Sequence, residues 1–412
     1  MQVHGEKEPE QVERIPNWTP MTDFIAAGAP YPKSAQEPRD DRTAGSSQIA
    51  VEDRLFACNG QGQYGAITEM RAGYEARVGT SIPYHAGATR IWSLPDCAGS
   101  GTFLFVSFDL YNELLFLSAD VQSMEQEDEK LHDSLDFHVR TIIAGGFDDT
   151  TIQITEKSVR LLSLSSDGSH NIPAPLVRIL PNEETITSAA IHTATHSFVL
   201  VTRSDHIIRL FFTKVMQEQG GGLAMATLGE SVLWDEQGME PSCLTMCSIQ
   251  GSLHIFVGTT DRNLRIYCAD NGLVLIMRFQ LDLVTLMERT TAAGCESLVV
   301  VRLPERAGFS RASNQLLCGM RDGYMLAYDI AVSGQGFIDP SSMQAFLIGQ
   351  TPVSIRSDSA HPGNAFISCG GRLSLFTIHN GMVEKSSIRE IWLNDYKAVS
   401  SHHTFLGEQL LS

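Results

Sequence analysis

Four residues in the middle of the chain have the types and spacing of a metal site. His192 and His196 lie four residues apart, as do Cys243 and Cys247. Imidazole nitrogen and thiolate sulfur are the usual protein ligands of zinc, but structural zinc modules are small and hold their ligand pairs closer together than these pairs, which are about fifty residues apart. We therefore expect no metal. Residues four apart on a strand share a face, so Cys243 and Cys247 are expected to fill one layer of the core.

Three glycines near the N-terminus, Gly60, Gly62 and Gly65, have the spacing of a dinucleotide-binding loop. That loop requires a helix directly after its last glycine, because the helix N-terminus binds the pyrophosphate. The six residues after Gly65 form a short alternating run that Gly73 soon stops. The pattern therefore favours a wide hairpin turn, and we expect no cofactor.

The sequence contains no nucleophile elbow, phosphate-binding loop or metalloprotease helix. Asp148 and Asp149 come nearest to a pair of catalytic carboxylates, but adjacent residues on a strand point to opposite faces, which favours a solvated turn. His402 and His403, near the C-terminus, are expected to face solvent. We therefore predict no catalytic residues and no enzymatic activity.

The elements that would position these residues are short hairpins. Seven units each contain two runs rich in Val, Ile, Leu, Phe and Thr, joined by turn formers such as Asp205 or Gly323. The units span residues 53–71, 103–117, 150–162, 197–211, 253–267, 315–328 and 364–377.

A lone hairpin cannot bury its apolar face, so a period of roughly 52 residues implies sheets that stack on one another. The prediction is an all-β fold, a β-propeller of about seven four-stranded blades in a complete or an incomplete ring. The dipeptide of Trp234 and Asp235 occurs once, outside the hairpins, and so does not indicate the tryptophan-aspartate repeat class.

Composition narrows the possible partners. The chain has 412 residues, 43% of them hydrophobic, and a net charge of −18, which repels phosphate backbones and favours protein partners. We expect a soluble intracellular chain without structural disulfides, because most of its eight cysteines lie in apolar runs. Residues 28–50 and the acidic stretch 123–130 are expected to be exposed loops.

Ten strings, in order along the chain, resemble one family of large triple-propeller proteins. They are RLFACNG (54–60), GAITEMRAGYEARVG (65–79), IWSL (91–94), FLFVSF (103–108), IQITEKSVRLLS (152–163), SCLTM (242–246), VGTTDRNLRIY (257–267), LLCGMRDGYML (316–326), LIGQTPVSIR (347–356) and AFISC (365–369). That family includes the large subunits of damaged-DNA-binding protein and of cleavage and polyadenylation specificity factor, and a splicing factor 3b subunit. The resemblance is to the run entering the second propeller and to that propeller itself.

The resemblance implies a domain division. Residues 1–94 would be a disordered N-terminus with strands like the end of a preceding propeller, residues 95–395 the second propeller, and residues 396–412 a tail or truncated last blade. Six hairpins would then supply six of seven blades, and we hypothesise that the hairpin at 53–71 fills the vacant position. Closing the ring would avoid leaving blade edges in water.

The resemblance also implies a function, namely a non-enzymatic nuclear scaffold in a DNA-repair and ubiquitin-ligase complex or in an mRNA-processing complex. A cullin is the sharpest partner that it suggests, with nucleic acid reached through the complex and no membrane contact. One alternative is a propeller hydrolase or lyase with a site in the central channel, although the hairpins show no recurring carboxylate or histidine. Another is a non-functional fragment of the family.

Overall fold

The computed structural model describes most of the chain between Met21 and Arg389. The described residues are 21–27, 54–59, 66–70, 73–75, 87–118, 124–127, 134–166, 175–181, 183–217, 223–225, 231–234, 240–270, 272–281, 294–302, 314–333, 336–358, 361, 363–379 and 382–389. Within these segments, no helix has the length and apolar character needed to cross a bilayer. The helices described there are two short 3-10 turns, η3 (Thr193–Thr195) and η4 (Pro340–Ser342).

The chain divides into two compact units, one made of Met1–Ala44 with Ile49–Tyr74, the other of Gly45–Gln48 with Glu75–Ser412. The first unit holds a three-stranded antiparallel sheet of β1 (Met21–Ala27), β2 (Arg54–Asn59) and β3 (Ala66–Met70), in that order.

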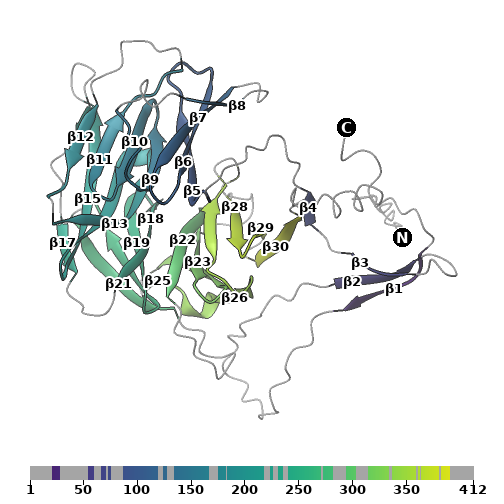
Figure 1. The fold of residues 1–412 in the computed structure, drawn as a ribbon. Helices are drawn as coiled ribbons and strands as arrows, with labels where there is room; N and C mark the ends of the chain where they lie inside the picture. The colour runs from purple at the N-terminus through teal and green to yellow at the C-terminus, as the bar shows by residue number, and fades with distance from the viewer. Residues whose placement is uncertain are drawn as a thin grey trace, which may run out of the picture. The chain divides into compact units, whose positions relative to one another are not determined.

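The second unit holds six sheets that follow one another in chain order, from blue to yellow in Figure 1. The first contains β5 (Arg90–Pro95), β6 (Gly101–Ser107), β7 (Asn112–Ser118) and β8 (Met124–Gln126). The second contains β9 (Thr141–Phe147), β10 (Thr150–Thr155), β11 (Ser158–Leu162) and β12 (Leu176–Ile179). The third contains β13 (Thr185–His192), β14 (Ser197–Ser204), β15 (Ile207–Gln217), β16 (Leu223–Met225) and β17 (Ser231–Trp234).

The remaining three sheets complete the series. The fourth contains β18 (Pro241–Ile249), β19 (Ser252–Thr259), β20 (Asn263–Cys268) and β21 (Val274–Gln280). The fifth contains β22 (Cys295–Arg302), β23 (Asn314–Met320), β24 (Tyr324–Ser333), β25 (Gly336–Ile338) and β26 (Gln344–Leu347). The sixth contains β27 (Ser354–Ser357), β28 (Asn364–Cys369), β29 (Arg372–His379) and β30 (Met382–Arg389), with β4 (Gly73–Glu75) beside β30.

These sheets are propeller blades. Their first strands lie against one another in succession, β5 against β9, then β13, β18, β22 and β27. The second strands of the second to fifth blades are almost wholly buried, because neighbouring blades cover both faces. In the sixth blade, β28 is buried at every second residue. Outermost strands such as β12 and β21 alternate between exposed and half-buried residues. Buried aliphatic and aromatic side chains fill the spaces between blades.

All seven predicted hairpins are confirmed. Six are the second and third strands of the six blades, and the seventh, at 53–71, is β2 and β3. The predicted number of blades is wrong, since the propeller unit contains six. The physical reason is that β2 pairs with β1 in the smaller unit. The hypothesis that this hairpin completes a ring stays a prediction.

Four of the turn residues that the sequence predicts are confirmed. Asp205, Gly323, Gly370 and Gly371 all have positive φ and lie in the tight turns of their hairpins. Gly323 has a second constraint, because a Cβ atom there would lie 2.0 Å from the carbonyl oxygen of Gly349.

The expectation of an exposed loop at 123–130 is wrong in part. Met124–Gln126 forms β8, which pairs with β7 as the outermost strand of the first blade. Backbone pairing with an open sheet edge outweighs the polar composition of this stretch. The other expected loop, 28–50, lies outside the described residues.

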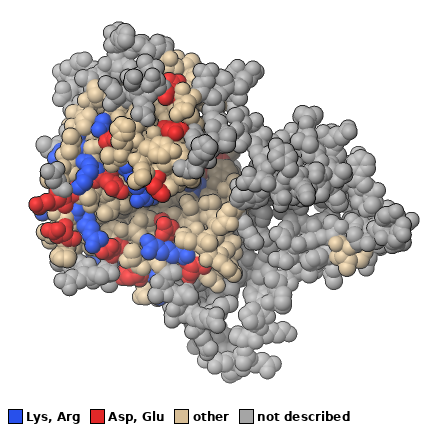
Figure 2. Space-filling model, viewed as in Figure 1, with Lys and Arg blue, Asp and Glu red and all other residues tan. Residues whose placement is uncertain are grey.

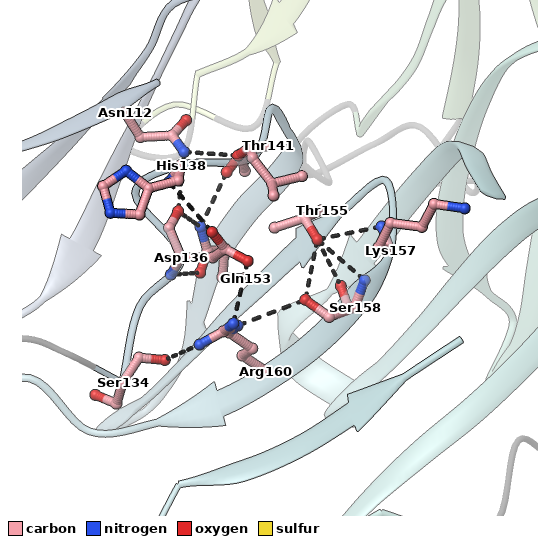
Figure 3. A network of polar contacts seen from close by, with 11 residues as sticks. Asn112, Ser134, Asp136, His138, Thr141, Gln153, Thr155, Lys157, Ser158 and Arg160 are labelled. Atoms are coloured by element: carbon pink, nitrogen blue, oxygen red, sulfur yellow. Dashed lines mark hydrogen bonds and ion pairs between the residues drawn. The ribbon is translucent and has the colours of Figure 1, made fainter. Parts of the chain in front are cut away.

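A polar network anchors the segment between the first and second blades (Figure 3). The buried Asn112 side chain donates to the carbonyl oxygens of Asp136 and Val139, at 2.9 and 2.8 Å. Arg160 of β11 forms an ion pair with Asp136 at 3.1 Å and donates to the carbonyl oxygen of Ser134. These contacts fix the segment that leads into β9, the innermost strand of the second blade.

Candidate functional site

The six first strands, which lie against one another in succession from β5 to β27, all begin at one end of the propeller, here called the strand-start end. Hydrogen bonds connect neighbouring strands there. The Arg90 guanidinium at the beginning of β5 donates to the Ile142 carbonyl oxygen of β9 at 2.5 Å. The Ser297 hydroxyl of β22 donates to the Val353 carbonyl oxygen at 2.7 Å and accepts the backbone N–H of Ile355 in β27 at 3.1 Å.

A charged residue recurs at this end, one in each blade, between the residue before the first strand and the third residue of that strand. These residues are Arg90, Arg140, Glu184, Glu240, Glu296 and Arg356. The arginines belong to the sixth, first and second blades, and the glutamates to the third, fourth and fifth. The strand-start end therefore has a basic side and an acidic side.

Two of the three glutamates on the acidic side are neutralised by arginines. Glu240 forms an ion pair with Arg203 at 3.2 Å, and Glu296 forms one with Arg321 at 2.9 Å. Glu184 accepts a hydrogen bond from the Thr202 hydroxyl. These partners come from the second strands of the blades or the turns that follow them.

The basic side is only partly neutralised. Arg140 lies 3.8 Å from Glu156 in an exposed ion pair. Among the described residues, neither Arg90 nor Arg356 has a carboxylate partner. Both residues are exposed to solvent. Protein atoms nevertheless surround each guanidinium closely enough for burial to lower its pKa.

Arg90 also experiences the other charges of this end. After burial, repulsion by Arg140 and Arg356 lowers its pKa further, while attraction to Glu296 raises it. Arg140, Arg356 and Glu296 therefore each lie within electrostatic reach of Arg90, although the four residues come from four different blades. Figure 2 shows Lys and Arg patches interspersed with Asp and Glu patches over the described atoms of the face in view.

The opposite end of the ring brings together residues that the sequence analysis treated separately. Asp148 lies in the turn after β9, and His196 lies directly after η3. Oδ2 of Asp148 is 3.1 Å from Nε2 of His196. The Asp148 side chain is 77% exposed, which confirms the solvated turn expected there. His192 hydrogen-bonds to the Thr195 hydroxyl, and its pKa is lowered by burial and then by the charge of Arg302.

The structure separates the histidine pair from the cysteine pair. Cys243 and Cys247 are buried together in the core between the fourth and fifth blades, as expected, and Sγ of Cys243 lies 3.5 Å from Sγ of Cys295. Among the described residues, no three His, Cys, Asp or Glu side chains converge to hold a metal ion. The described residues include all eight cysteines, and none of them forms a disulfide.

The remaining candidates do not form a site. The glycines at 60, 62 and 65 lie outside the described residues, but the strand β3 begins at Ala66, where dinucleotide binding would need a helix. Trp234 ends β17 and lies under the Arg265 guanidinium, 3.8 Å from its ring centroid. His402 and His403 lie outside the described residues.

The outermost strands carry exposed apolar side chains. On β12 these are Val177 and Ile179, the latter 72% exposed, and on β21 they are Val274 and Ile276. Exposed β-branched residues on an outer strand invite pairing with another chain, and proteins usually avoid them or cover them.

Sequence reasoning missed the recurring charges because it searched the hairpins. The charged position lies one strand earlier, in the innermost strand of each blade. The sequence does contain a signal for these residues. An arginine or glutamate stands near the start of an apolar run, and successive residues of this kind are separated by about the length of one blade. Because three are basic and three acidic, they do not form the recurrent carboxylate or histidine position typical of catalysis.

Six successive antiparallel sheets around a ring of first strands define the class of the protein, a β-propeller. The family follows from the comparison with known families. The model of the RSE1/DDB1/CPSF1 second β-propeller matches residues 78–409, and the chain belongs to this family. The resemblance inferred from the ten strings is thereby confirmed.

No curated protein matches the chain. Among solved structures, the chain is similar to a protein from Bacteroides uniformis provisionally named a 6-phosphogluconolactonase, with 13% identity and a TM-score of 0.49. The alignment covers 81% of this chain and 90% of that protein.

Proposed function

We propose that this chain is a non-enzymatic propeller scaffold that binds other proteins in a nuclear DNA-repair and ubiquitin-ligase complex or in an mRNA-processing complex. The family membership supports protein binding in general. The nuclear setting and the particular complex are the finer part of the proposal, suggested by the damaged-DNA-binding and polyadenylation members of the family. A cullin is the partner to test first.

The exposed strands β12 and β21 are the observation that carries the proposal. Each presents two β-branched apolar side chains to solvent, on the outer strand of a blade. Apolar side chains at the centre of a protein contact contribute most of its free energy. A scaffold needs such positions on its outside, whereas an enzyme needs convergent polar groups on its axis.

The polar groups near the axis do not favour the alternative of a hydrolase or lyase. Glu240 and Glu296 are each held by an arginine, and Glu184 by a hydroxyl. A general acid or base must instead reach the substrate proton. Nucleic acid remains a partner of the complex, because the net charge of −18 opposes direct binding to phosphate backbones.

Affinity purification of the tagged chain from its own cells, read by mass spectrometry, tests the proposal. Recovery of a cullin or repair factors supports the first type of complex, and recovery of cleavage or splicing factors supports the second. Recovery of chaperones alone contradicts a scaffold role and supports a non-functional fragment.

A further inference from the structure

We propose that His254 forms a pH-sensitive contact between the fourth and fifth blades. Its neutral ring holds β25 in place, and protonation of the ring in mild acid releases β25. His254 lies in β19 of the fourth blade, and β25 is the short strand that follows β24 in the fifth. The proposal goes beyond the scaffold function, because it concerns a movement within the isolated chain.

The aromatic ring of Phe337 joins β25 to the fourth blade. Its centroid lies 4.6 Å from that of the His254 ring and 5.9 Å from that of Phe256, which is also in β19. His254 is 6% exposed, Phe337 8% and Phe256 0%. The three rings therefore exclude most water, and the imidazole packs as an apolar ring for as long as it is uncharged.

The strand β25 has little else to hold it. It contains three residues, Gly336–Ile338, and its register with β24 places Ile330 opposite Ile338 and Ser333 opposite Gly336, with an irregularity between these pairs. Among the described strands, only β24 pairs with it. Short strands at a sheet edge open at a lower free energy than central strands do. Loss of the contact with His254 can therefore release β25 while the rest of the blade stays folded.

A hydrogen bond determines where the ring takes up a proton. Nδ1 of His254 lies 2.9 Å from the carbonyl oxygen of Ser252. Because a carbonyl oxygen only accepts, Nδ1 carries the hydrogen in the neutral ring, and Nε2 is the nitrogen that becomes protonated. No described residue forms a hydrogen bond with Nε2. Protonation would therefore create a charged, buried donor without a partner beside the ring of Phe337, which is unfavourable.

The surroundings of His254 favour the neutral ring. Burial lowers its pKa, and although the Ser252 carbonyl and the charge of Asp270 raise it, the pKa stays below its ordinary value. Asp270 is exposed, and its carboxylate accepts the backbone N–H of Leu253. The one nearby carboxylate that acts on the ring is thus screened by water and shared with the backbone.

The other elements that pack against His254 supply no further negative charge. The residues opposite it on β18 and β20 are Cys247 and Cys268, and β25 has no ionisable residue. The fifth blade contributes Arg302, whose guanidinium lies 3.9 Å from Sγ of Cys247. This group is a cation and cannot stabilise an imidazolium.

The direction of the pH dependence follows from this environment. His254 takes up a proton less readily when β25 is closed than when it is open, so the open form binds more protons. The contact is fully present above the ordinary pKa of histidine, about 6.5, and is progressively lost as the pH falls below it. One pH unit below that value, the equilibrium constant for opening can rise by at most about tenfold.

Hydrogen exchange at about pH 7.5 and about pH 5.5, read by mass spectrometry and corrected for the intrinsic pH dependence of exchange, tests the release. We expect exchange in the peptide that contains β25 to rise severalfold at the lower pH, while peptides from β10 and β14 stay unchanged. An equal rise in all strands would mean general acid unfolding. That result, or the absence of any rise in β25, would overturn the proposal.

Three substitutions separate the effect of the proton from that of the ring. His254→Phe keeps a ring against Phe337 but cannot be protonated, so β25 should stay protected at both pH values. His254→Gln keeps a donor for the Ser252 carbonyl but loses the ring, so β25 should exchange fast at both. His206→Gln is the matched control, because His206 is exposed in the turn between β14 and β15, and it should keep the pH dependence of the unaltered chain. Persistence of that dependence in both His254 variants would assign it to another group and overturn the proposal.

An NMR titration of the unaltered chain with isotopically labelled histidine tests the premise without any substitution. We expect the His254 ring to protonate at a lower pH in the folded chain than in the chain unfolded by denaturant. Protonation at the same pH or a higher one in the folded chain would show that the fold does not disfavour the charged ring, and it would overturn the proposal.

Discussion

The side-chain amide of Gln153 holds the backbone of Asp136 on both sides. Its Oε1 accepts the N–H of Asp136 at 2.8 Å, and its Nε2 donates to the carbonyl oxygen of Asp136 at 2.9 Å and to the hydroxyl of Thr141 at 3.0 Å (Figure 3). Gln153 is 0% exposed. A strand of the second blade therefore fixes the segment that connects this blade to the first.

Replacing Gln153 with alanine should destabilise the chain by about 2–4 kcal/mol, because partly buried backbone groups of Asp136 and the buried Thr141 hydroxyl lose their partner. Denaturant unfolding measures the effect. Gln280→Ala is the control, since Gln280 is exposed on β21, and its cost should stay within about 0.5 kcal/mol. Equal costs for the two substitutions would mean that the network in Figure 3 does not stabilise the fold.

Gly258 lies where the fourth and fifth blades pack closely. A Cβ atom at this position would lie 2.6 Å from Sγ of Cys243 and 3.0 Å from Sγ of Cys295. Gly258→Ala should therefore cost about 1–3 kcal/mol through overpacking. Gly87→Ala serves as the control, because nothing lies within 4 Å of its added Cβ. A stable Gly258→Ala protein would show that the packing between the fourth and fifth blades is loose.

The buried thiols should be unreactive in the folded protein. Burial raises the pKa of Cys243 well above its ordinary value, and Cys295, beside it, also has a pKa well above the ordinary one. At pH 8, iodoacetamide should modify the exposed Cys58 and leave both buried thiols unmodified until the protein unfolds. Peptide mass spectrometry before and after denaturant addition reads the pattern. Rapid modification of Cys295 in the native protein would contradict the blade packing.

Asp96 should make stability depend on pH in acid. Burial raises the pKa of this carboxyl, but hydrogen bonds from Ser166, Ser100 and the Ala98 N–H outweigh burial and leave the pKa below its ordinary value. A carboxyl with a lowered folded-state pKa adds stability above its unfolded-state pKa and loses it as the pH falls through the folded-state value. The stability difference between the unaltered chain and Asp96→Asn should therefore be constant from pH 7 to 5 and shrink below pH 4. A difference that stays constant down to pH 2 would contradict this.

The hairpins could be predicted from sequence because both of their strands and the turn between them are local. Their apolar runs and the residues at Asp205 and Gly323 suffice. The number of blades could not be predicted in this way, because it depends on which sheet each outer strand joins. The strand β8 shows the same limit, since its pairing with β7 is not visible in its acidic sequence.

The charged end of the ring could not be predicted because its members meet only after the blades assemble. Arg90 and Arg356 are separated by nearly the whole propeller in sequence, yet Arg356 is one of the charges that lower the pKa of Arg90. Asp148 and His196 likewise belong to consecutive blades, and their sequence patterns suggest two different sites, a carboxylate pair and a metal site. The core role of Cys243 and Cys247 was predictable because four-residue spacing on one strand fixes a shared face.

The scaffold function is tested most directly by comparing two substitutions on β21. Ile276 and Gln280 lie four residues apart on the exposed face of this strand, so Ile276→Glu and Gln280→Glu introduce the same group on the same face. Each tagged variant would be purified from the protein's own cells beside the unaltered chain, with partners quantified by mass spectrometry. We predict that the amount of partner protein recovered with Ile276→Glu falls at least tenfold, whereas Gln280→Glu retains its partners. Only the first substitution removes apolar contact area. Retention of every partner by Ile276→Glu, together with the corresponding Ile179→Glu variant of β12, would contradict the proposal that these strands carry the function.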